Sequence, residues 1–301
     1  MEGIFKNYRS GVKDDFHKPV LLKEALNSLN IKQGKWYIDC TLGGGNYSYE
    51  LYRRGANVLS IDVDEEAISY VRQKFGGKEN WIIIQDNFKN LKRIVSAQQI
   101  KVFGIVFDLG VSLRQLRSTK RGFSFNRESV LDMRMDSRTK LRAVDLVNQA
   151  TKEELYEIFT HYGEEERAWA IADAILRARL EQKIATTFEL VKIVEGVLGR
   201  KQGGKNSATK IFQALRIYVN DELNNLKTGL ADAIGLLEEE GRVVIISYHS
   251  LEDRIVKNAL RNAEKRREIK ILTDKIVVPG EKEIEMNPSA RSAKLRAAVK
   301  L

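Results

Sequence analysis

The chain has 301 residues, a formal net charge of +10, an isoelectric point near 9.5 and 43% hydrophobic residues. This length allows one large domain or two modest ones, and the absence of an apolar run of 18 or more residues argues against a membrane span. The first 16 residues lack a signal-peptide core. One cysteine, Cys40, and three histidines exclude an internal disulfide and make a structural metal site unexpected. We expect a cytoplasmic protein whose positive charge favours a polyanionic partner such as nucleic acid.

Apolar strands and helices alternate in the first third of the chain. After a polar segment, 1–16, the pattern predicts helices at 22–29, 47–54, 65–75 and 89–98. Continuous apolar runs predict strands at 36–38, 58–61, 81–85 and 102–107. Strands of this composition are typical of a parallel sheet that is buried on both faces. The fold class is therefore predicted to be α/β, with a Rossmann-like doubly wound sheet.

A glycine-rich turn follows the first strand, and an acidic residue follows the second. Gly43 and Gly45 in this turn allow positive φ angles and let the backbone approach a ligand closely. The carboxylate of Asp62, at the tip of the second strand, suits a ribose diol. The combination predicts a nucleoside site, and an ordinary turn beside a solvated carboxylate is the alternative.

The residues around this turn favour S-adenosylmethionine over NAD. A dinucleotide fingerprint requires a third glycine where this chain has Ser48. Asp39 precedes the turn, where a carboxylate would repel a pyrophosphate but attract a sulfonium and an amino group. After the third strand, Asp86 and Asn87 can bond an adenine amino group, and Phe88 can cover its ring.

The alternation of strands and helices stops after residue 112, and a basic, irregular stretch reaches residue 142. Thr151 begins a capping-box sequence for a helix to about residue 162, and further helices are expected at 164–182 and 187–198. A Gly-Lys loop at 199–206 ends this block. Residues 115–205 are therefore predicted to form an inserted helical domain. The flanking segments 1–114 and 206–301 would form one discontinuous sheet domain.

The sheet is expected to resume after a long amphipathic helix. This helix begins at Ser207, and the helical region ends at Gly241. The remaining pattern predicts a fifth strand at 242–247, a helix at 251–267 and last strands at 269–272 and 293–299.

Several unusual stretches resemble one known family. They read HKPVLLKEAL, DLGVSLRQL, RGFSF, LDMRMD, FQALRIYVNDEL, SYHSLEDRIVK and NPSARSAKLR, and they extend from residue 17 to residue 296. They look like the small-subunit rRNA cytosine-N4 methyltransferase family (the MraW or RsmH group). The resemblance implies a class I S-adenosylmethionine-dependent methyltransferase fold with a helical insertion. It also implies N4-methylation of a decoding-centre cytosine in bacterial 16S rRNA.

The resemblance leaves alternatives open. A catalytically weakened paralogue could act as an rRNA- or ribosome-binding module, and the substrate could be another nucleic acid or a protein. The partner is expected to be 16S rRNA or the small ribosomal subunit, and either naked rRNA or the assembled subunit is possible. The sequence does not decide between a monomer and a homodimer.

The resemblance also implies a set of cofactor contacts. Asp39 and Gly43 are already expected from the local pattern. The contacts that the resemblance implies are Gly45, Asn46, Tyr47, Asp62, Phe88, Asp108 and Gln115. Two departures stand out, because the family usually has Gly-His at Asn46-Tyr47 and a serine at Leu113. Asn46 is expected to keep the bend, because asparagine tolerates positive φ better than other non-glycine residues.

Methylation of a cytosine amine needs an acceptor for the amine hydrogens, because the nitrogen lone pair is delocalised into the ring. Many amino-methyltransferases use an Asp/Asn-Pro-Pro-aromatic motif after the fourth strand. This chain has Asp108-Leu109-Gly110-Val111 there. The candidates for the acceptor are Asp108, Asp132 and His249. Ser250 is expected to cap the following helix while His249 faces the site.

Basic and aromatic residues outside the turn are candidates for RNA contact. Tyr248 could stack on a flipped base, and phenylalanines set among arginines suit stacking with phosphate contact. The predicted RNA-binding residues are Arg121, Phe123, Phe125, Arg127, Tyr248, Arg291 and Arg296. Packing of the insertion against the sheet domain is an equal alternative for the two phenylalanines. The last two arginines could instead brace the final strand.

Overall fold

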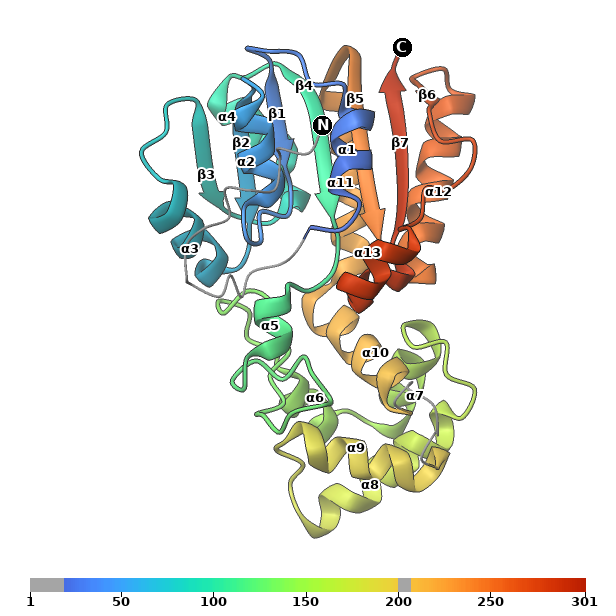
Figure 1. The fold of residues 1–301 in the computed structure, drawn as a ribbon. Coiled ribbons are helices and arrows are strands. Elements are labelled where there is room, and N and C mark those ends of the chain that lie inside the picture. Colours follow the sequence, from blue (N-terminus) through green and yellow to red (C-terminus); the bar gives the residue numbers. More distant parts are fainter. Residues whose placement is uncertain (1–18, 200–206) are drawn as a thin grey trace.

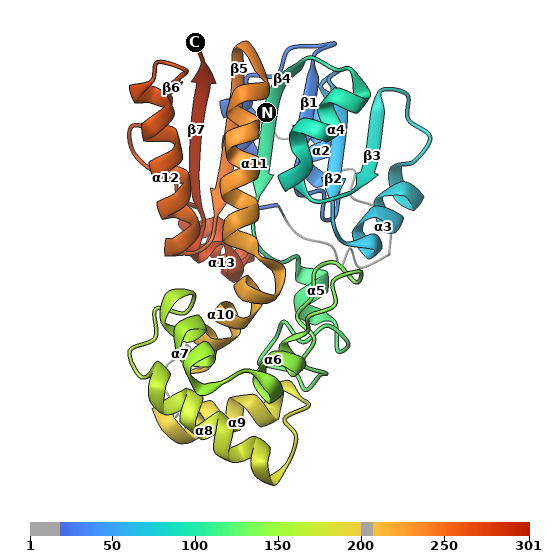
Figure 2. The same ribbon diagram turned by 180° about the vertical axis from the view of Figure 1, so that it is seen from behind.

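The computed structural model of the protein describes residues 19–199 and 207–301. The predicted polar segment 1–16, His17 and most of the loop 199–206 lie outside the described residues. A sheet with helices on both faces forms one body, and a helical body lies at one end of its strands (Figures 1 and 2). In the part of the chain that is described, no helix is long and apolar enough to cross a membrane.

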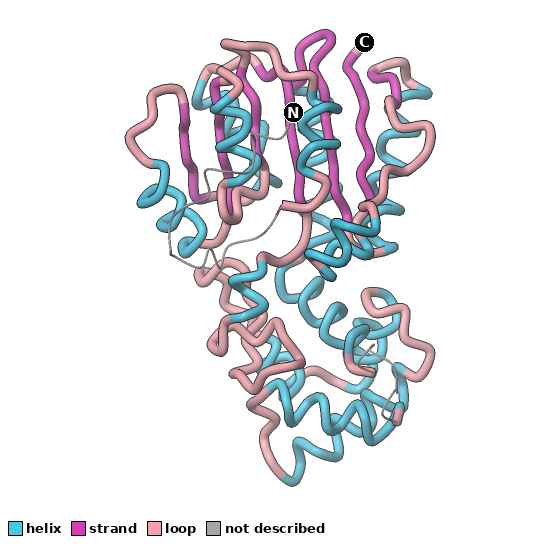
Figure 3. Tube along the Cα trace, viewed as in Figure 1, coloured by secondary structure: helices cyan, strands magenta, loops and turns pink. Residues whose placement is uncertain are grey.

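Seven strands form one mixed sheet in the order β3-β2-β1-β4-β5-β7-β6. The strands are β1 (Trp36–Asp39), β2 (Asn57–Asp62), β3 (Trp81–Gln85), β4 (Val102–Asp108), β5 (Leu237–Ser247), β6 (Ile269–Ile271) and β7 (Lys294–Lys300). The first five are parallel, and β7 is antiparallel to both β5 and β6. All of them lie in the upper body (Figure 3). The predicted doubly wound sheet is confirmed, and its parallel strands end at the edge that faces the helical body.

Helices cover both faces of the sheet because neighbouring strand residues point to opposite sides. In β1, Tyr37 packs with one buried cluster and Ile38 with the other. One face carries α1 (Leu22–Leu29), α2 (Asn46–Arg53) and α3 (Glu65–Phe75). The other carries α4 (Leu91–Gln98), α11 (Glu222–Leu236) and α12 (Ser250–Lys265). The short elements η1 (Phe88–Asn90), α13 (Glu281–Met286) and η2 (Pro288–Ser292) complete this body.

The helical body has its own hydrophobic core. Its helices are α5 (Leu113–Arg117), α6 (Ala143–Gln149), α7 (Lys152–His161), α8 (Ala168–Glu181), α9 (Thr187–Leu198) and α10 (Thr209–Asn220). Thr151 caps α7 in the predicted capping box with Glu154. The second predicted helix begins later than expected, because Glu164 has a φ of 48°. Although the predicted domain boundary lies at 205, α10 packs in this core.

The prediction of one long amphipathic helix from Ser207 is wrong, because the structure has two helices in this segment. Asp221 joins α10 to α11 with a φ of 50°, which ends the helical hydrogen-bond pattern. The apolar stripe continues through this break, but its two halves serve different cores. Phe212 and Leu215 pack in the helical body, whereas Leu226 and Leu230 pack against the sheet.

Gly104 in β4 generates a prediction about folding. A Cβ at this position would overlap the ring of Tyr37 and lie 3.3 Å from Leu29. Gly104→Ala should therefore lower the free energy of unfolding by about 1–3 kcal/mol, measured by urea denaturation. Gly235→Ala is the control, because a Cβ there meets no atom within 4 Å and alanine favours the helix α11. Equal stability of the Gly104 variant and the parent would contradict this packing.

Candidate active site

A cavity of about 440 Å³ lies between the strand tips of the sheet and the helical body. Asp62, Asp86 and Asp108 line it from the carboxyl ends of β2, β3 and β4. Residues 135–139 and the α10–α11 junction close it from the other side. Ligands of open α/β sheets bind at this edge, and the volume suits a small-molecule ligand.

The glycine-rich turn differs from the prediction in one respect. Gly43 and Gly45 have φ angles of 48° and 77°, but Asn46 is the first residue of α2 and is not among the residues with positive φ. The expectation that Asn46 keeps the bend is therefore wrong. A Cβ on Gly45 would lie 3.0 Å from Val71, so this glycine allows α3 to pack against the turn. Gly43 and Asn46 line the cavity.

Asp62 lines the cavity, as predicted for a ribose contact. Its Oδ2 accepts a hydrogen bond from the amide of Gly43 at 2.8 Å, and its Oδ1 accepts one from the amide of Asp64 at 2.9 Å. Burial raises the pKa of Asp62 to about 6, although these amide bonds act in the opposite direction. The carboxylate is thus held in place before any ligand arrives.

Asp39 lies beneath the turn. Its side chain is fully buried and accepts a hydrogen bond from the Ser48 hydroxyl at 2.7 Å and one from the Thr41 amide at 3.2 Å. Ser48 also bonds Ser60, which accepts a bond from the Trp81 ring nitrogen. Burial raises the pKa of Asp39 to about 7. Asp39 itself does not line the cavity, although its neighbours in the chain do. It would therefore act on a ligand only through its electrostatic field.

The remaining predicted cofactor residues line the cavity. The ring of Phe88 is nearly perpendicular to that of Phe107, with centroids 5.5 Å apart. Tyr47 stands where the resemblance implies a histidine, and its buried hydroxyl donates to the carbonyl of Val20. Gln115 donates from Nε2 to Asp64 at 2.7 Å. Their proposed contact with a cofactor stays a prediction.

Among the acceptor candidates, Asp108 alone lines the cavity. Its amide donates to the Thr41 hydroxyl, and its Oδ1 accepts a hydrogen bond from the Tyr248 hydroxyl at 2.7 Å. Asp132 is bound at both carboxylate oxygens by Arg134, at 2.8 Å each. This geometry favours Asp108.

His249 has a structural position that the sequence did not predict. It is the N-cap of α12, where its Nδ1 accepts a hydrogen bond from the amide of Glu252 at 3.3 Å. The expectation that Ser250 caps this helix is wrong. Ser250 is the first residue of α12, and its hydroxyl donates to Glu164 in the helical body.

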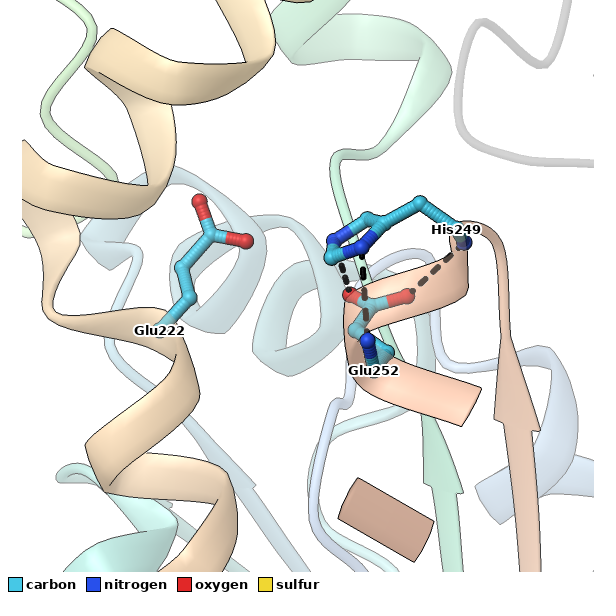
Figure 4. A group of neighbouring side chains, drawn as sticks. All are labelled: Glu222, His249 and Glu252. Atoms are coloured by element: carbon cyan, nitrogen blue, oxygen red, sulfur yellow. Dashed lines mark hydrogen bonds and ion pairs between the residues drawn. The ribbon is translucent and has the colours of Figure 1, made fainter. Parts of the chain in front are cut away.

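Glu222, His249 and Glu252 offer ligand atoms within 4.8 Å of one another, which is close enough to suggest a metal site (Figure 4). The protein already uses these groups. Arg216 bonds both carboxylate oxygens of Glu222 at 2.9 Å, and its positive charge opposes a cation. Because Nδ1 of His249 accepts a hydrogen bond, the neutral ring carries its proton on Nε2, which then has no lone pair for a metal. The group fits a buried ionic network better than a metal site.

The predicted RNA-binding residues have diverse positions. Phe123 is buried in the core of the helical body, and Phe125 meets Phe212 edge-on at 5.7 Å. Both phenylalanines therefore have a packing role, as in the alternative, but they pack within the helical body and not against the sheet domain. Tyr248 packs against the sheet cluster and bonds Asp108.

The four predicted arginines fall into two groups. Arg121 pairs with Asp64 at 3.2 Å, and Arg296 pairs with Asp253 at 2.7 Å, as expected for a residue that braces β7. Arg127 and Arg291 are exposed. Only these two keep surface positions that suit phosphate contact.

Two carboxylates that connect the bodies were missed by sequence reasoning. Asp64 caps α3 and receives both Gln115 and Arg121 from the insertion. The role of Asp64 as a helix N-cap could have been predicted, because acidic residues precede an apolar segment here. Glu222 and its partner Arg216 give no local signal, because the break between their helices cannot be read from the pattern.

The raised pKa of Asp39 predicts a pH dependence of stability. The ordinary carboxyl value is 3.8 and the folded value about 7, so the folded protein loses stability as pH rises through this window. Asp39→Asn should remove up to about 4 kcal/mol of this loss. Ser48 can then turn its hydroxyl toward Ser60. The measurement is urea denaturation of both proteins between pH 4 and pH 8, and parallel stability curves would contradict the prediction.

Comparison with known proteins agrees with the resemblance. Residues 14–301 match the MraW methylase family. The chain is 45% identical over 291 residues to "Ribosomal RNA small subunit methyltransferase H" of Persephonella marina, which covers 95% of this chain and 99% of that protein. It is 42% identical over 306 residues to the protein of the same name from Carboxydothermus hydrogenoformans, with coverage of 95% and 98%. The predicted family is confirmed, and with it the class I methyltransferase fold and S-adenosylmethionine as methyl donor. The chain belongs to the MraW methylase family.

Proposed function

We propose that this protein transfers the methyl group of S-adenosylmethionine to the exocyclic N4 of a decoding-centre cytosine in 16S rRNA. The observation that carries the proposal is the cavity between sheet and insertion, which three strand-tip carboxylates line from one side. The relatives named above are ribosomal RNA small subunit methyltransferases. The choice of cytosine, its position in the rRNA and the residue roles go beyond these names.

The cavity lining supports the cofactor part of the proposal. When bound, S-adenosylmethionine supplies an electrophilic methyl carbon next to a positive sulfur. The lining offers Asp62 for the ribose hydroxyls and Phe88 for the adenine ring. Asp39 and Asp108 add negative charge around the turn; burial raises the pKa of Tyr47 most, and these two charges raise it further. A cationic nucleoside is favoured by these charges, whereas a pyrophosphate would be repelled.

Asp108 is the group that we propose to act on the amine. Its carboxylate would accept a hydrogen bond from the N4 amino group, which localises the nitrogen lone pair for attack on the methyl carbon. The N–C bond then forms as the S–C bond breaks. The amine proton passes to the carboxylate and from there to solvent. Orientation of the amine and this negative charge supply the rate enhancement.

Exposed basic residues support an RNA partner. Arg114, Arg117, Lys120 and Arg127 lie on the basic stretch that links β4 to the helical body, and their side chains are exposed. This stretch borders the cavity through Ser112 and Gln115. Phosphate contact at this position would bring a nucleotide to the mouth of the cavity.

The decisive experiment is methyl transfer to small ribosomal subunits that lack the modification. With radiolabelled S-adenosylmethionine, the subunits should be labelled, and mass spectrometry of nucleosides should identify N4-methylcytidine. Deproteinised 16S rRNA in a parallel reaction separates naked rRNA from the assembled subunit as substrate. Binding of the methyl donor without transfer would favour the rRNA-binding paralogue. Label in another nucleoside or in protein would favour another methyltransferase.

Asp108→Asn tests the acceptor. Asparagine keeps the size of the side chain but cannot take a proton, so turnover should fall by about 100-fold or more. Affinity for S-adenosylmethionine, measured by calorimetry, should change far less. Asp132→Asn is the comparison, because its carboxylate is engaged by Arg134. A larger loss of turnover in the Asp132 variant would reverse the assignment.

Asp62→Asn tests the ribose contact. Replacement of the carboxylate should weaken binding of S-adenosylmethionine by about tenfold or more. Because the pKa of Asp62 is about 6, affinity of the parent should be constant above that pH and fall below it, as the carboxylate gains a proton. Calorimetry at several pH values measures both effects. The exposed Asp274, changed to Asn, controls for charge, and unchanged affinity in the Asp62 variant would refute the contact.

A further inference from the structure

The Tyr248 hydroxyl is used inside the protein, although the ring was expected to stack on RNA. Its oxygen donates a hydrogen bond to Oδ1 of Asp108 at 2.7 Å. The ring packs against the buried cluster on one face of the sheet. Burial, together with the negative Asp108, raises the pKa of Tyr248 well above its ordinary value. The hydroxyl therefore keeps its proton and remains a donor throughout the physiological range.

The two partners come from neighbouring parallel strands. Asp108 ends β4, and Tyr248 follows β5 directly. The strands are paired up to Asp108 and Ile246, and the amide of Leu109 extends the pairing by donating to the carbonyl of Ile246 at 3.0 Å. Strand register thus sets the distance between carboxylate and ring.

The backbone of Tyr248 is held separately. Oε2 of Glu252 accepts a hydrogen bond from the amide of Tyr248 at 2.8 Å and one from the amide of His249 at 3.3 Å. Glu252 is 2% exposed, and its Oε1 lies 3.2 Å from Nε2 of His249. Burial acts to raise the pKa of Glu252, but the neighbouring His249 and Arg216 and the amide of Tyr248 hold it below its ordinary value, so the carboxylate stays ionised. The contacts between His249 and Glu252 that Figure 4 shows, together with the bond from the Tyr248 amide to Glu252, therefore fix the point from which the tyrosine reaches Asp108.

We propose that Tyr248 is a positioning residue for methyl transfer, whose hydroxyl fixes the Asp108 carboxylate toward the amine of the target cytosine. This inference rests on the proposed function. A carboxylate that turns freely about its last bond would meet the amine in many orientations, and a hydrogen bond to one oxygen restricts this motion.

Tyr248→Phe tests the proposal because it removes the hydroxyl and retains the ring. The single-turnover rate of methyl transfer to unmodified small subunits should fall by about 10- to 100-fold. The dissociation constants for S-adenosylmethionine and for the subunit should stay within about twofold of the parental values. Because phenylalanine keeps the ring, a tyrosine that merely stacks on RNA would leave the rate at the parental value, and this result would overturn the proposal.

Tyr37→Phe is the matched control. Tyr37 is a buried tyrosine of β1 whose hydroxyl accepts a hydrogen bond from the amide of Lys32 at 2.8 Å, at the edge of the sheet opposite the cavity. Its variant should show a comparable loss of stability in thermal unfolding but an unchanged rate. Equal rates for the Tyr37 and Tyr248 variants would overturn the positioning role, because a lost buried bond would then explain both.

A double-mutant cycle separates action through Asp108 from action elsewhere. In an Asp108→Ala background, Tyr248→Phe should lower the residual rate no further, because its partner is gone. A further loss of the same size would show that the hydroxyl acts on another group. If the parent labels an atom other than N4, the proposed function is wrong. If the parent labels N4 and Tyr248→Phe keeps the parental rate, only the role of Tyr248 is wrong.

Discussion

The desolvation of two carboxylates at the glycine-rich turn is the constraint on which the site depends. Asp39 and Asp62 would be fully ionised at neutral pH in water, but burial raises the pKa of each. The protein offsets this with local donors, namely the Ser48 hydroxyl and the amides of Thr41, Gly43 and Asp64. Uncompensated charge remains, because hydrogen bonds stabilise a buried carboxylate only in part. A cationic nucleoside in the cavity would supply what the donors lack, so affinity and charge selectivity have one origin.

The same carboxylates explain the need for a second body. Strand tips alone form an open edge, and water would screen their field. The insertion closes the edge with residues 135–139 and with the α10–α11 junction. It is attached by ion pairs of low exposure, including Arg121 with Asp64. Glu164 adds a link at the surface, where it accepts hydrogen bonds from Ser250 and Arg254 of α12. Closure of the cavity is therefore built from contacts between residues that are distant in the sequence.

The sequence predicted the sheet well because its information is local. Each buried parallel strand is a continuous apolar run, and each capping box lies within four residues, as at Thr151. The nucleoside site followed from the same locality, since strand tips meet at one edge. The helix break at Asp221 was missed because the apolar stripe keeps its period while the core behind it changes. The partners of Phe123, Arg121 and His249 were missed for a related reason, because each is set by packing between elements.

The absence of proline after β4 has a structural consequence of its own. The chain has three prolines, Pro19, Pro279 and Pro288, and none of them comes directly after Asp108. A proline at 109 would lack the amide that pairs Leu109 with Ile246. Because the pairing continues, β4 and β5 stay in register up to the cavity, and the chain turns only at Gly110, whose φ of 93° suits glycine. The Tyr248 ring then lies beside this glycine, 3.6 Å from the position of a Cβ. The aromatic partner of the aspartate can therefore come from the next strand, since sheet register replaces the rigidity that a proline motif would provide.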